Sequence, residues 1–367
     1  MAGPLQRRRE RERLERLARD FAVNAPNSAT AGTGAEPEAQ ATYSTAYQAG
    51  MREEMIRDAT IFVLGTDLYD RGGHFSQVKG LGPEFGADRV RDTPISEAAM
   101  VAAGVGAAMN GTRPVVDLNF IDFSYGAMDE LVNQAAKVRY MWNRPVPLVV
   151  RATAGVAQGG AQHNNSLQSW FMGTPGLAVV FPSRPWDVKG LLKSALRGHD
   201  PVVFLMHKLL TGARGPVGGE DDVVPIGSAR IVRPGRDVTL ATYGYGVVLA
   251  EKAAAAVSGE GIDVEVIDLR TLAPLDVDTV AASVRRTGRA LVLDEAPAVA
   301  GPAAEIAAAI SDAAFWYLDQ PVTRLTGRHS PIPHSPALIA GLLPDEAATV
   351  DALRRLARAS GPEVAAS

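Results

Sequence analysis

The sequence contains no cysteine among its 367 residues. Disulfide bonds, a thiolate nucleophile and cysteine-bound zinc are therefore excluded. Aromatic residues are scarce at 6%, and no apolar run reaches the roughly 18 residues that a membrane-spanning helix requires. The 37 basic residues are offset by 41 acidic ones, so the net charge of −4 provides no electrostatic reason for a nucleic acid partner. We expect neither membrane insertion nor nucleic acid binding.

The N-terminal stretch has little apolar character. Residues 6–20 (QRRRERERLERLARD) alternate arginine and glutamate, and residues 24–40 (NAPNSATAGTGAEPEAQ) are rich in alanine, glycine and proline. Charge stands where a secretory signal would have an apolar core, so we expect a cytoplasmic protein. We interpret residues 1–40 as a polar, disordered extension, helical only locally, that is solvated or contacts a partner. The interleaved glutamates argue against an RNA-binding arm.

From residue 41 the pattern changes to strands alternating with helices. Apolar runs rich in β-branched residues predict strands, and the amphipathic or alanine-rich segments between them predict helices. The expected strands are at 60–67, 113–120, 146–153, 177–183 and 201–206, and the expected helices at 46–58, 95–110, 128–141 and 186–196. Such alternation predicts a mainly parallel sheet covered by helices on both faces, in a domain that spans residues 41–215.

Residues 210–227 (LTGARGPVGGEDDVVPIG) interrupt this alternation with glycines, prolines and acids. We interpret residues 216–230 as an interdomain linker. Beyond it, strands are expected at 237–244, 262–269, 289–296 and 321–327, with helices at 247–257, 277–285 and 303–318. The α/β fold class therefore extends to a second, smaller domain at residues 231–367.

Familiar catalytic motifs are missing. The chain has no phosphate-binding P-loop, no G-x-S-x-G nucleophile elbow and no H-E-x-x-H zinc helix. The stretch GVGAAMNG (104–111) lies inside an expected helix rather than at a strand-to-helix turn, so it does not qualify as a dinucleotide fingerprint. The six histidines show no metal-ligand spacing. Any chemistry must therefore depend on single residues.

Five single residues lie in settings that suit chemistry. Glu97 begins a helix of small apolar residues, where a buried carboxylate needs a partner; the alternative is a carboxylate stabilised by the helix dipole. His163 lies in a glycine-rich loop (GVAQGGAQHNNS) after a strand, a common place for catalytic groups, or is a plain surface histidine. Phe120 and Phe123 lie at a strand end and could pack in the core, and His74 could face solvent or a site. Composition leaves these alternatives open.

Many longer stretches match a known family in order. They include DTPISE, GAAMNGTRPVV, AQHNNSL, KGLLKSA, DPVVFL, VEVIDLRTL, LVLDEAP and SPIPHSPAL. From residue 41 to its end the chain resembles the β subunit of the thiamine-diphosphate-dependent dehydrogenase component of 2-oxo acid dehydrogenase complexes, of the pyruvate, branched-chain and acetoin types. The resemblance implies a transketolase-like fold, in which a pyrimidine-binding domain is followed by a smaller C-terminal α/β domain.

The resemblance also implies roles for particular residues. Glu97 would hydrogen-bond N1′ of the cofactor's aminopyrimidine, so its partner would not be part of the protein. A carboxyl group in an apolar pocket can share a proton with this ring nitrogen, which favours the imino tautomer that activates the thiazolium. Phe123 would stack near the pyrimidine, and Ile95 and Asn119 would also lie at the cofactor. His163 would face the substrate or a lipoyl group.

Members of the family bind potassium through backbone carbonyls, and the matching positions here are Leu148, Ala195, Gly198 and Asp200. Thiamine-diphosphate enzymes as a superfamily hold the diphosphate and Mg²⁺ of the cofactor through a G-D-G motif, which this chain lacks. The resemblance therefore implies a separate α subunit that supplies this motif, in an α2β2 heterotetramer with its active sites between α and β. The small residues after Glu97 would permit close approach at a subunit interface.

The implied reaction is oxidative decarboxylation of a 2-oxo acid, or cleavage of acetoin, with the acyl group passed to a lipoyl carrier on an acyltransferase. Several positions depart from the family pattern, and we interpret them as clustered on the substrate side: Thr66, Asn119, Asn164, Asn165, Gly173 and Asp294. They leave room for an acetoin-type or specialised substrate. The alternatives are a split transketolase-like enzyme that transfers two-carbon units, and a non-catalytic scaffold. Retention of Glu97 and His163 argues against the scaffold.

Overall fold

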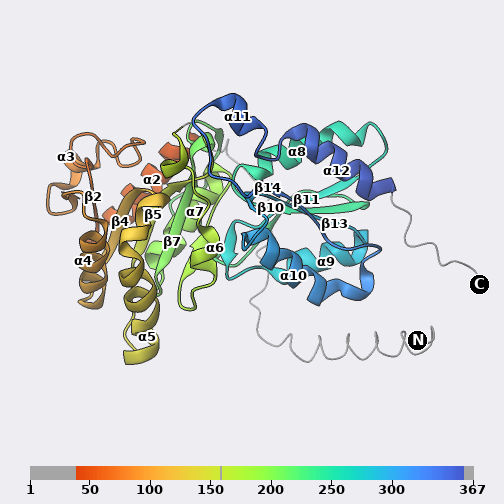
Figure 1. The fold of residues 1–367 in the computed structure, drawn as a ribbon. Coiled ribbons are helices and arrows are strands. Elements are labelled where there is room, and N and C mark those ends of the chain that lie inside the picture. Colours follow the sequence, from red (N-terminus) through yellow and green to blue (C-terminus); the bar gives the residue numbers. More distant parts are fainter. Residues whose placement is uncertain (1–38, 158, 359–367) are drawn as a thin grey trace, which may run out of the picture. The chain divides into compact units, whose positions relative to one another are not determined.

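The computed structural model describes residues 39–157 and 159–358. The predicted extension, residues 1–40, lies outside the described residues except for its last two. Two large sheets flanked by helices make up the described chain, together with a small ribbon that pairs β1 (Gln40–Thr42) with β8 (Arg214–Pro216) (Figure 1). None of the described helices is long and apolar enough to cross a membrane.

Seven of the described strands form the first sheet, in the order β12-β6-β7-β5-β4-β2-β3. All neighbouring strands run parallel except β12 and β6. The strands are β2 (Ile61–Gly65), β3 (Val90–Asp92), β4 (Arg113–Phe120), β5 (Val149–Ala154), β6 (Ala178–Val180), β7 (Val202–His207) and β12 (Thr271–Ala273). The predicted, mainly parallel sheet is confirmed, and β3 and β12 are additions to it.

Helices cover both faces of this sheet. They are α2 (Tyr43–Arg57) and α7 (Pro185–Arg197) on one face, and α4 (Glu97–Met109) and α5 (Ala136–Trp142) on the other. Because successive residues of a strand point to opposite faces, Val115 enters the core under α2 and α7, whereas Val116 enters the core under α4. This explains why the strands are continuous apolar runs rather than alternating ones.

The small residues of α4 allow this helix to lie close to β4. Gly104 is the clearest case, since a Cβ atom there would lie 2.6 Å from Cγ2 of Val116. On the opposite side of the helix Ala99, Ala102 and Gly106 are exposed. The run of small residues that follows Glu97 therefore serves the core on one face and leaves a smooth outer face.

Five described strands form the second sheet, in the order β14-β13-β10-β11-β9, with β9 alone antiparallel among them. They are β9 (Arg230–Arg233), β10 (Val238–Thr242), β11 (Val264–Asp268), β13 (Ala290–Pro297) and β14 (Thr323–Gly327). Helices α8 (Gly246–Ser258) and α12 (Glu346–Arg358) lie on one side, and α9 (Val277–Thr287) and α10 (Pro302–Ala314) on the other (Figure 1). The predicted smaller α/β domain is thus confirmed.

Several elements differ from the expectation. The helix predicted at 128–141 is a π-helical segment, η2 (Glu130–Ala135), continued by α5. The helix predicted at 303–318 ends as α10 and is followed by a 3₁₀ turn, η5 (Phe315–Tyr317). Helices α3 (Leu81–Phe85), α6 (Gln168–Met172), α11 (Pro336–Ala340) and α12 were not predicted.

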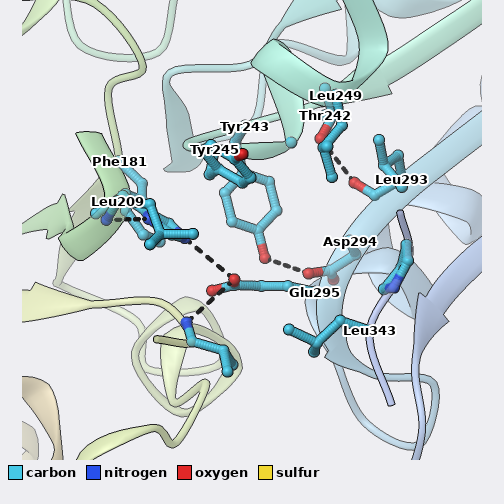
Figure 2. A pocket seen from close by; sticks show the side chains of 14 residues that line it. Phe181, Leu209, Thr242, Tyr243, Tyr245, Leu249, Leu293, Asp294, Glu295 and Leu343 are labelled. Atoms are coloured by element: carbon cyan, nitrogen blue, oxygen red, sulfur yellow. Dashed lines mark hydrogen bonds and ion pairs between the residues drawn. The ribbon is translucent and has the colours of Figure 1, made fainter. Parts of the chain in front are cut away.

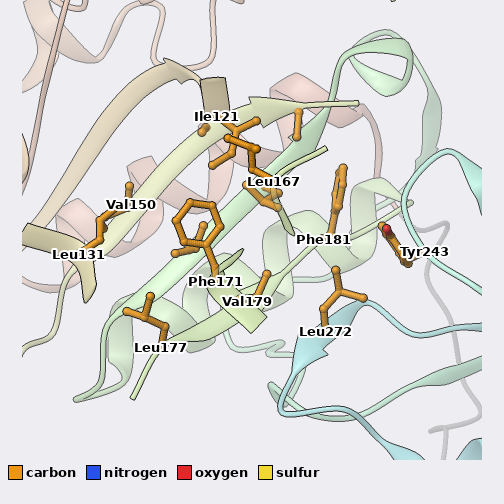
Figure 3. Packing of buried hydrophobic residues seen from close by; sticks show 14 of the residues in the cluster. Ile121, Leu131, Val150, Leu167, Phe171, Leu177, Val179, Phe181, Tyr243 and Leu272 are labelled. Atoms are coloured by element: carbon orange, nitrogen blue, oxygen red, sulfur yellow. The ribbon is translucent and has the colours of Figure 1, made fainter. Parts of the chain in front are cut away.

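The two domains share both a sheet and a core. Strand β12 belongs by sequence to the second domain, yet it pairs antiparallel with β6 at the edge of the first sheet. Around it, Phe181 of the first domain packs in one cluster with Tyr243 and Leu272 of the second (Figure 3). Because β12 lies in the first sheet, the division into 41–215, 216–230 and 231–367 remains a proposal.

A buried cluster of charges joins the domains beside β12. Nη1 of Arg270 donates a hydrogen bond of 2.9 Å to Oδ1 of Asp187, in the first turn of α7. Ser183 donates a hydrogen bond to Asp268, the last residue of β11. Burial and the carboxylate of Asp187 raise the pKa of Asp268 to about 7, against the opposing effects of Ser183 and Arg270. The folded chain therefore holds a proton here at mildly acidic pH.

We expect Asp268→Asn to flatten the pH dependence of stability between about pH 5 and about pH 8. An unfolded aspartate has a pKa of about 3.9, so up to about pH 7 the folded state binds more protons, and its stability falls as the pH rises. Asparagine cannot ionise and keeps an oxygen for the Ser183 hydroxyl. The measurement is the thermal midpoint of both proteins at both pH values. Equal slopes would contradict the prediction.

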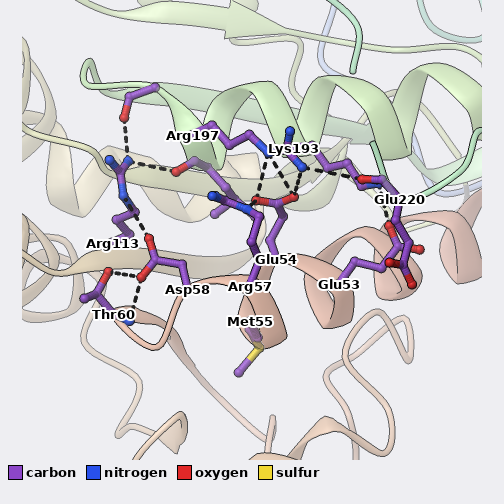
Figure 4. A network of polar contacts seen from close by, with 12 residues as sticks. Glu53, Glu54, Met55, Arg57, Asp58, Thr60, Arg113, Lys193, Arg197 and Glu220 are labelled. Atoms are coloured by element: carbon purple, nitrogen blue, oxygen red, sulfur yellow. Dashed lines mark hydrogen bonds and ion pairs between the residues drawn. The ribbon is translucent and has the colours of Figure 1, made fainter. Parts of the chain in front are cut away.

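Charged side chains also join α2 to α7 (Figure 4). Glu54, only 1% exposed, pairs with Arg57 at 2.7 Å and with Arg197 at 2.6 Å. Lys193 is fully buried and pairs with Glu53 at 2.5 Å. Its ammonium group also donates to two backbone carbonyls of the interdomain segment, at 2.7 and 2.9 Å. A buried charge with several partners is costly to break, because each removal leaves another group unpaired.

Lys193→Met is expected to lower the free energy of unfolding by about 2–4 kcal/mol, since it leaves Glu53 and the two carbonyls short of a donor. Urea unfolding followed by circular dichroism measures this loss. The matched control is Lys252→Met on α8, an exposed lysine whose replacement should cost less than about 0.5 kcal/mol. A loss of unfolding free energy no larger than that of the control would contradict the prediction.

Candidate functional site

The carboxyl ends of the parallel strands β2, β4, β5 and β7 lie at one edge of the first sheet. Ligands of open α/β sheets bind outside this edge, because the chain segments that leave the strands meet there. Segment η1 (Ile121–Ala127) follows β4, and η3 (Ala161–His163) lies in the loop after β5. Of the residues singled out from the sequence, Phe123 belongs to η1 and His163 to η3.

Five aromatic rings gather at this edge: His74, Phe75, Phe120, Phe123 and His163, which we call the aromatic cluster. The ring of Phe120 is central, with centroids 5.0 Å from His163, 5.4 Å from His74 and 5.6 Å from Phe123. Phe120, Phe123 and His163 are half-buried, and His74 is exposed. The structure therefore brings together four predicted candidates and leaves their rings partly open to solvent rather than in the core.

A buried ion pair supports the cluster from beneath. Asp117 on β4 and Arg151 on β5 are each 1% exposed and lie 3.2 Å apart. Gln77 donates to Asp117 at 2.6 Å, and its carbonyl oxygen accepts the backbone N–H of Phe75 at 2.9 Å. The guanidinium of Arg151 lies 5.9 Å from the Phe75 ring. Sequence analysis missed this group, although opposite charges inside two adjacent predicted strands were a usable signal.

Asn119 lies at an irregularity of β4, between Asp117 and Phe120, with a left-handed φ of +59°. Its backbone N–H donates to Oδ1 of Asp117 at 2.8 Å. Its side-chain Oδ1 is buried and has no hydrogen-bond partner in the described residues. A buried acceptor without a donor is costly, so this oxygen suits a ligand that brings an N–H or O–H group.

Glu97 is the first residue of α4, which packs against the η1 segment that carries Phe123. Its side chain is half-buried and makes no hydrogen bond or ion pair within residues 39–157 and 159–358. Ile95, two residues earlier, is 79% exposed. A free carboxylate, the free oxygen of Asn119 and an exposed aliphatic side chain fit the chemistry of an aminopyrimidine, which has polar edges and an apolar face.

Two of the departures from the family pattern face inward. Asn164 is 2% exposed, and its side chain bonds to the backbone of Ala157 and Gly160. Asn165 bonds to Asp122. The short amide side chains of both residues close the loop that carries His163, and their place on the substrate side stays a prediction.

Asp294, another of these departures, lies in β13 of the second domain, and its place on the substrate side also stays a prediction. Tyr243 donates to Oδ1 of Asp294 at 2.6 Å, and the backbone N–H of Ala303, at the start of α10, donates to Oδ2 at 3.0 Å. Burial raises the pKa of Asp294 to about 6, against the opposing hydrogen bonds. Its role is to hold the second sheet to α10. Thr66 is half-buried and Gly173 exposed.

A cavity of about 70 Å³ lies between the domains, beside Asp294 (Figure 2). His207, at the end of β7, accepts the backbone N–H of Leu209 at Nδ1, so Nε2 carries the proton and donates to Glu295 at 3.1 Å. Burial favours a raised pKa for Glu295, but His207 and the other donors outweigh it and hold the pKa below its usual range. Sequence analysis did not predict this cavity.

The four positions predicted to bind potassium differ in how far their carbonyl oxygens are already engaged. The carbonyl of Leu148 accepts the N–H of Val202 at 2.9 Å, and that of Gly198 accepts Nη1 of Arg113 at 2.6 Å. Asp200 is paired with Arg139 at 2.5 Å, and Ala195 is buried in α7. A guanidinium on Gly198 disfavours a second cation at that oxygen. Potassium remains a prediction, and no cluster of three metal-ligating side chains occurs in the described chain.

Comparison with known proteins agrees with this architecture. The family model described as the transketolase pyrimidine-binding domain matches residues 39–213, and the transketolase C-terminal domain matches residues 227–348. Among solved structures, one titled split gene transketolase, inactive beta4 tetramer, superimposes with a TM-score of 0.71, covering 86% of this chain and 97% of that one. At 21% identity this likeness concerns the fold alone.

Three curated relatives are more similar in sequence. The chain is 42% identical over 317 residues to pyruvate dehydrogenase E1 component subunit beta of Rhizobium meliloti, covering 85% of this chain and 69% of the relative. It is 41% identical over 302 residues to 2-oxoisovalerate dehydrogenase subunit beta of Bacillus subtilis, covering 81% of this chain and 92% of that relative. It is 43% identical over 316 residues to acetoin:2,6-dichlorophenolindophenol oxidoreductase subunit beta of Cupriavidus necator, covering 83% of this chain and 93% of that relative.

Identity at this level extends over both domains and over nearly the whole length of two of these relatives. The parallel sheet, the smaller second α/β domain and the site at the carboxyl edge agree with it. The chain therefore belongs to the transketolase-like family of thiamine-diphosphate-dependent 2-oxo acid and acetoin dehydrogenase β subunits.

Proposed function

We propose that this protein, with a separate α subunit, oxidatively decarboxylates a 2-oxo acid or cleaves acetoin and passes the acyl group to a lipoyl carrier. The observation that carries the proposal is the unpaired Glu97 carboxylate at the same sheet edge as the aromatic cluster. Relatives named for pyruvate, 2-oxoisovalerate and acetoin are 41–43% identical to the chain, so both substrate types stay within the proposal.

In this proposal thiamine diphosphate supplies the nucleophile and the electron sink for breaking the carbon–carbon bond. Glu97 would hold a proton at N1′ of the pyrimidine, and Oδ1 of Asn119 would accept a hydrogen bond from the ring. Ile95 and Phe123 would contact its apolar faces. His163, whose ring is braced at right angles by Phe120 and Phe123, exchanges a proton with the substrate or meets the lipoyl group.

A partner subunit is part of the proposal for two reasons. The chain has no G-D-G motif, so the α subunit would hold the diphosphate and Mg²⁺. The outer face of α4 exposes Ala99, Ala102 and Gly106, small residues that permit close approach of another helix. Beyond it, Tyr140 is 94% and Trp142 56% exposed at the end of α5. Exposed apolar surface of this kind suits burial in an α2β2 heterotetramer.

A two-carbon transfer enzyme is the alternative, and the structural likeness to a split transketolase favours its fold only. A sugar phosphate would need cationic side chains at the site. The two described cations next to the aromatic cluster are engaged elsewhere, because Arg151 is paired with Asp117 and Lys208 is hydrogen-bonded to carbonyl oxygens. This favours the dehydrogenase.

Glu97→Gln in the reconstituted α–β pair is expected to lower the rate of dichlorophenolindophenol reduction with 2-oxo acids or acetoin by at least about 100-fold, because glutamine cannot hold a transferable proton at N1′. Size and thermal midpoint of the assembly should not change. The matched control is Glu346→Gln, since Glu346 is likewise the first residue of a helix, α12, and is exposed.

Two outcomes would count against the proposal. Full activity of Glu97→Gln would remove Glu97 from the mechanism. Ketol transfer between sugars without an oxidant, in the absence of dye reduction, would favour the two-carbon transfer enzyme.

A further inference from the structure

Lys208 is a half-buried cation for which neither the sequence pattern nor the proposed chemistry accounts. It begins η4 (Lys208–Leu210), immediately after β7. Its ammonium group donates to the carbonyl of Gly155 at 2.6 Å, to Oδ1 of Asn164 at 3.1 Å, and to the carbonyl of His163. A lysine ammonium has three N–H donors, so these three oxygens saturate it. It therefore has no donor left for a substrate.

All three oxygens belong to the loop that carries His163. This loop, the 155–166 loop, is described at residues 155–157 and 159–166 and lies between β5 and α6. Lys208 joins its first residue to His163 and Asn164. Gly159 and Gly160 within it have φ values of +152° and +73°. Glycines of this kind give a free loop many alternative conformations, so holding one conformation requires compensating contacts.

The remaining loop contacts converge on the same point. Oδ1 of Asn164, which accepts from Lys208, also accepts the N–H of Ala157 at 2.8 Å, and its amide donates to the carbonyl of Gly160 at 2.7 Å. The N–H of Val156 donates to Glu295 of the second domain at 3.2 Å. The loop is thus closed internally by Asn164 and anchored at its base from the other domain.

Lys208 also reaches the aromatic cluster. Its Nζ lies 5.5 Å from the centroid of Phe120, a distance that suits a cation–π contact, and Phe120 in turn lies 5.0 Å from the His163 ring. One cation therefore contacts both the main chain of His163 and the ring that braces its side chain. Burial lowers the pKa of Lys208, and Asp122 and Glu295 oppose that effect.

We propose that Lys208 is a positioning residue that fixes the 155–166 loop and so aims the imidazole of His163 at the substrate side of the site. It acts through His163 and contacts no substrate itself. Its loop role stands on the contacts alone, whereas its effect on catalysis rests on the proposed function.

The test compares Lys208→Met, Lys208→Arg and the control Lys252→Met in the full chain and in the reconstituted α–β pair. Methionine keeps the length and packing of the side chain but removes the cation and its donors. Hydrogen–deuterium exchange of the amides of residues 156, 157 and 159–166 reports loop order without any need for activity. Dye reduction with 2-oxo acids or acetoin reports catalysis as kcat and KM.

For Lys208→Met we expect exchange of the loop amides, Ala157 and Asn165 included, to be about tenfold faster or more, while β10 and α8 keep their protection. We expect kcat to fall about tenfold or more, with a smaller change in KM, because misaimed groups lower the rate of the chemical step. Lys208→Arg retains the charge and several donors and should lie between the parent and Lys208→Met in both measurements. Lys252→Met should match the parent.

Unchanged loop exchange in a folded Lys208→Met protein would overturn the proposal. Faster loop exchange with full kcat would overturn the link to His163. If the parent pair is inactive with every 2-oxo acid and acetoin, the proposed function fails, while the exchange data still decide the loop role. Should Lys208→Met fail to fold, Lys208→Gln, which keeps polarity but removes the cation and one of its three donors, provides the same comparison.

Discussion

The site depends on one buried ion pair, between Asp117 and Arg151 in the middle of the first sheet. The two residues are paired in register on the neighbouring strands β4 and β5, where neither side chain can reach water. Asp117 also accepts from Gln77, which holds the Phe75 backbone, and from the N–H of Asn119, which turns the chain before Phe120. A carboxylate that must satisfy so many donors thereby sets the shape of the edge above it.

Much of the fold could be predicted because the central strands are continuous apolar runs that can only be buried in a parallel sheet. β12 could not, since a three-residue strand has no periodicity and its partner β6 lies in another domain. The gathering of His163, Phe120 and Phe123 was open to prediction in outline, because all lie at or beyond the carboxyl ends of parallel strands. Lys208 was not, since its acceptors lie 44 to 53 positions earlier in the chain and meet it only after the loop has closed.

The candidate site in the described chain contains polar groups that have no partner within the chain. Glu97 and Asn119 keep oxygens without donors, and Ile95 is exposed to solvent, whereas beneath them Asp117 is paired with Arg151 and Gln77. Anything that binds the folded chain at these groups stabilises it by mass action. A hydrogen-bonded layer beneath, and acceptors without donors above it, together make a surface that suits binding of another molecule.

The insertion of β12 beside β6 has a consequence for how such a chain can be divided. A polypeptide severed between its domains would leave β6 as a bare sheet border, with backbone N–H and C=O groups free to recruit strands from other copies. A gene split at that point would thus encode a first domain that aggregates with its own copies through the exposed edge of β6. The coding sequences of the two domains are therefore expected to stay joined in one gene.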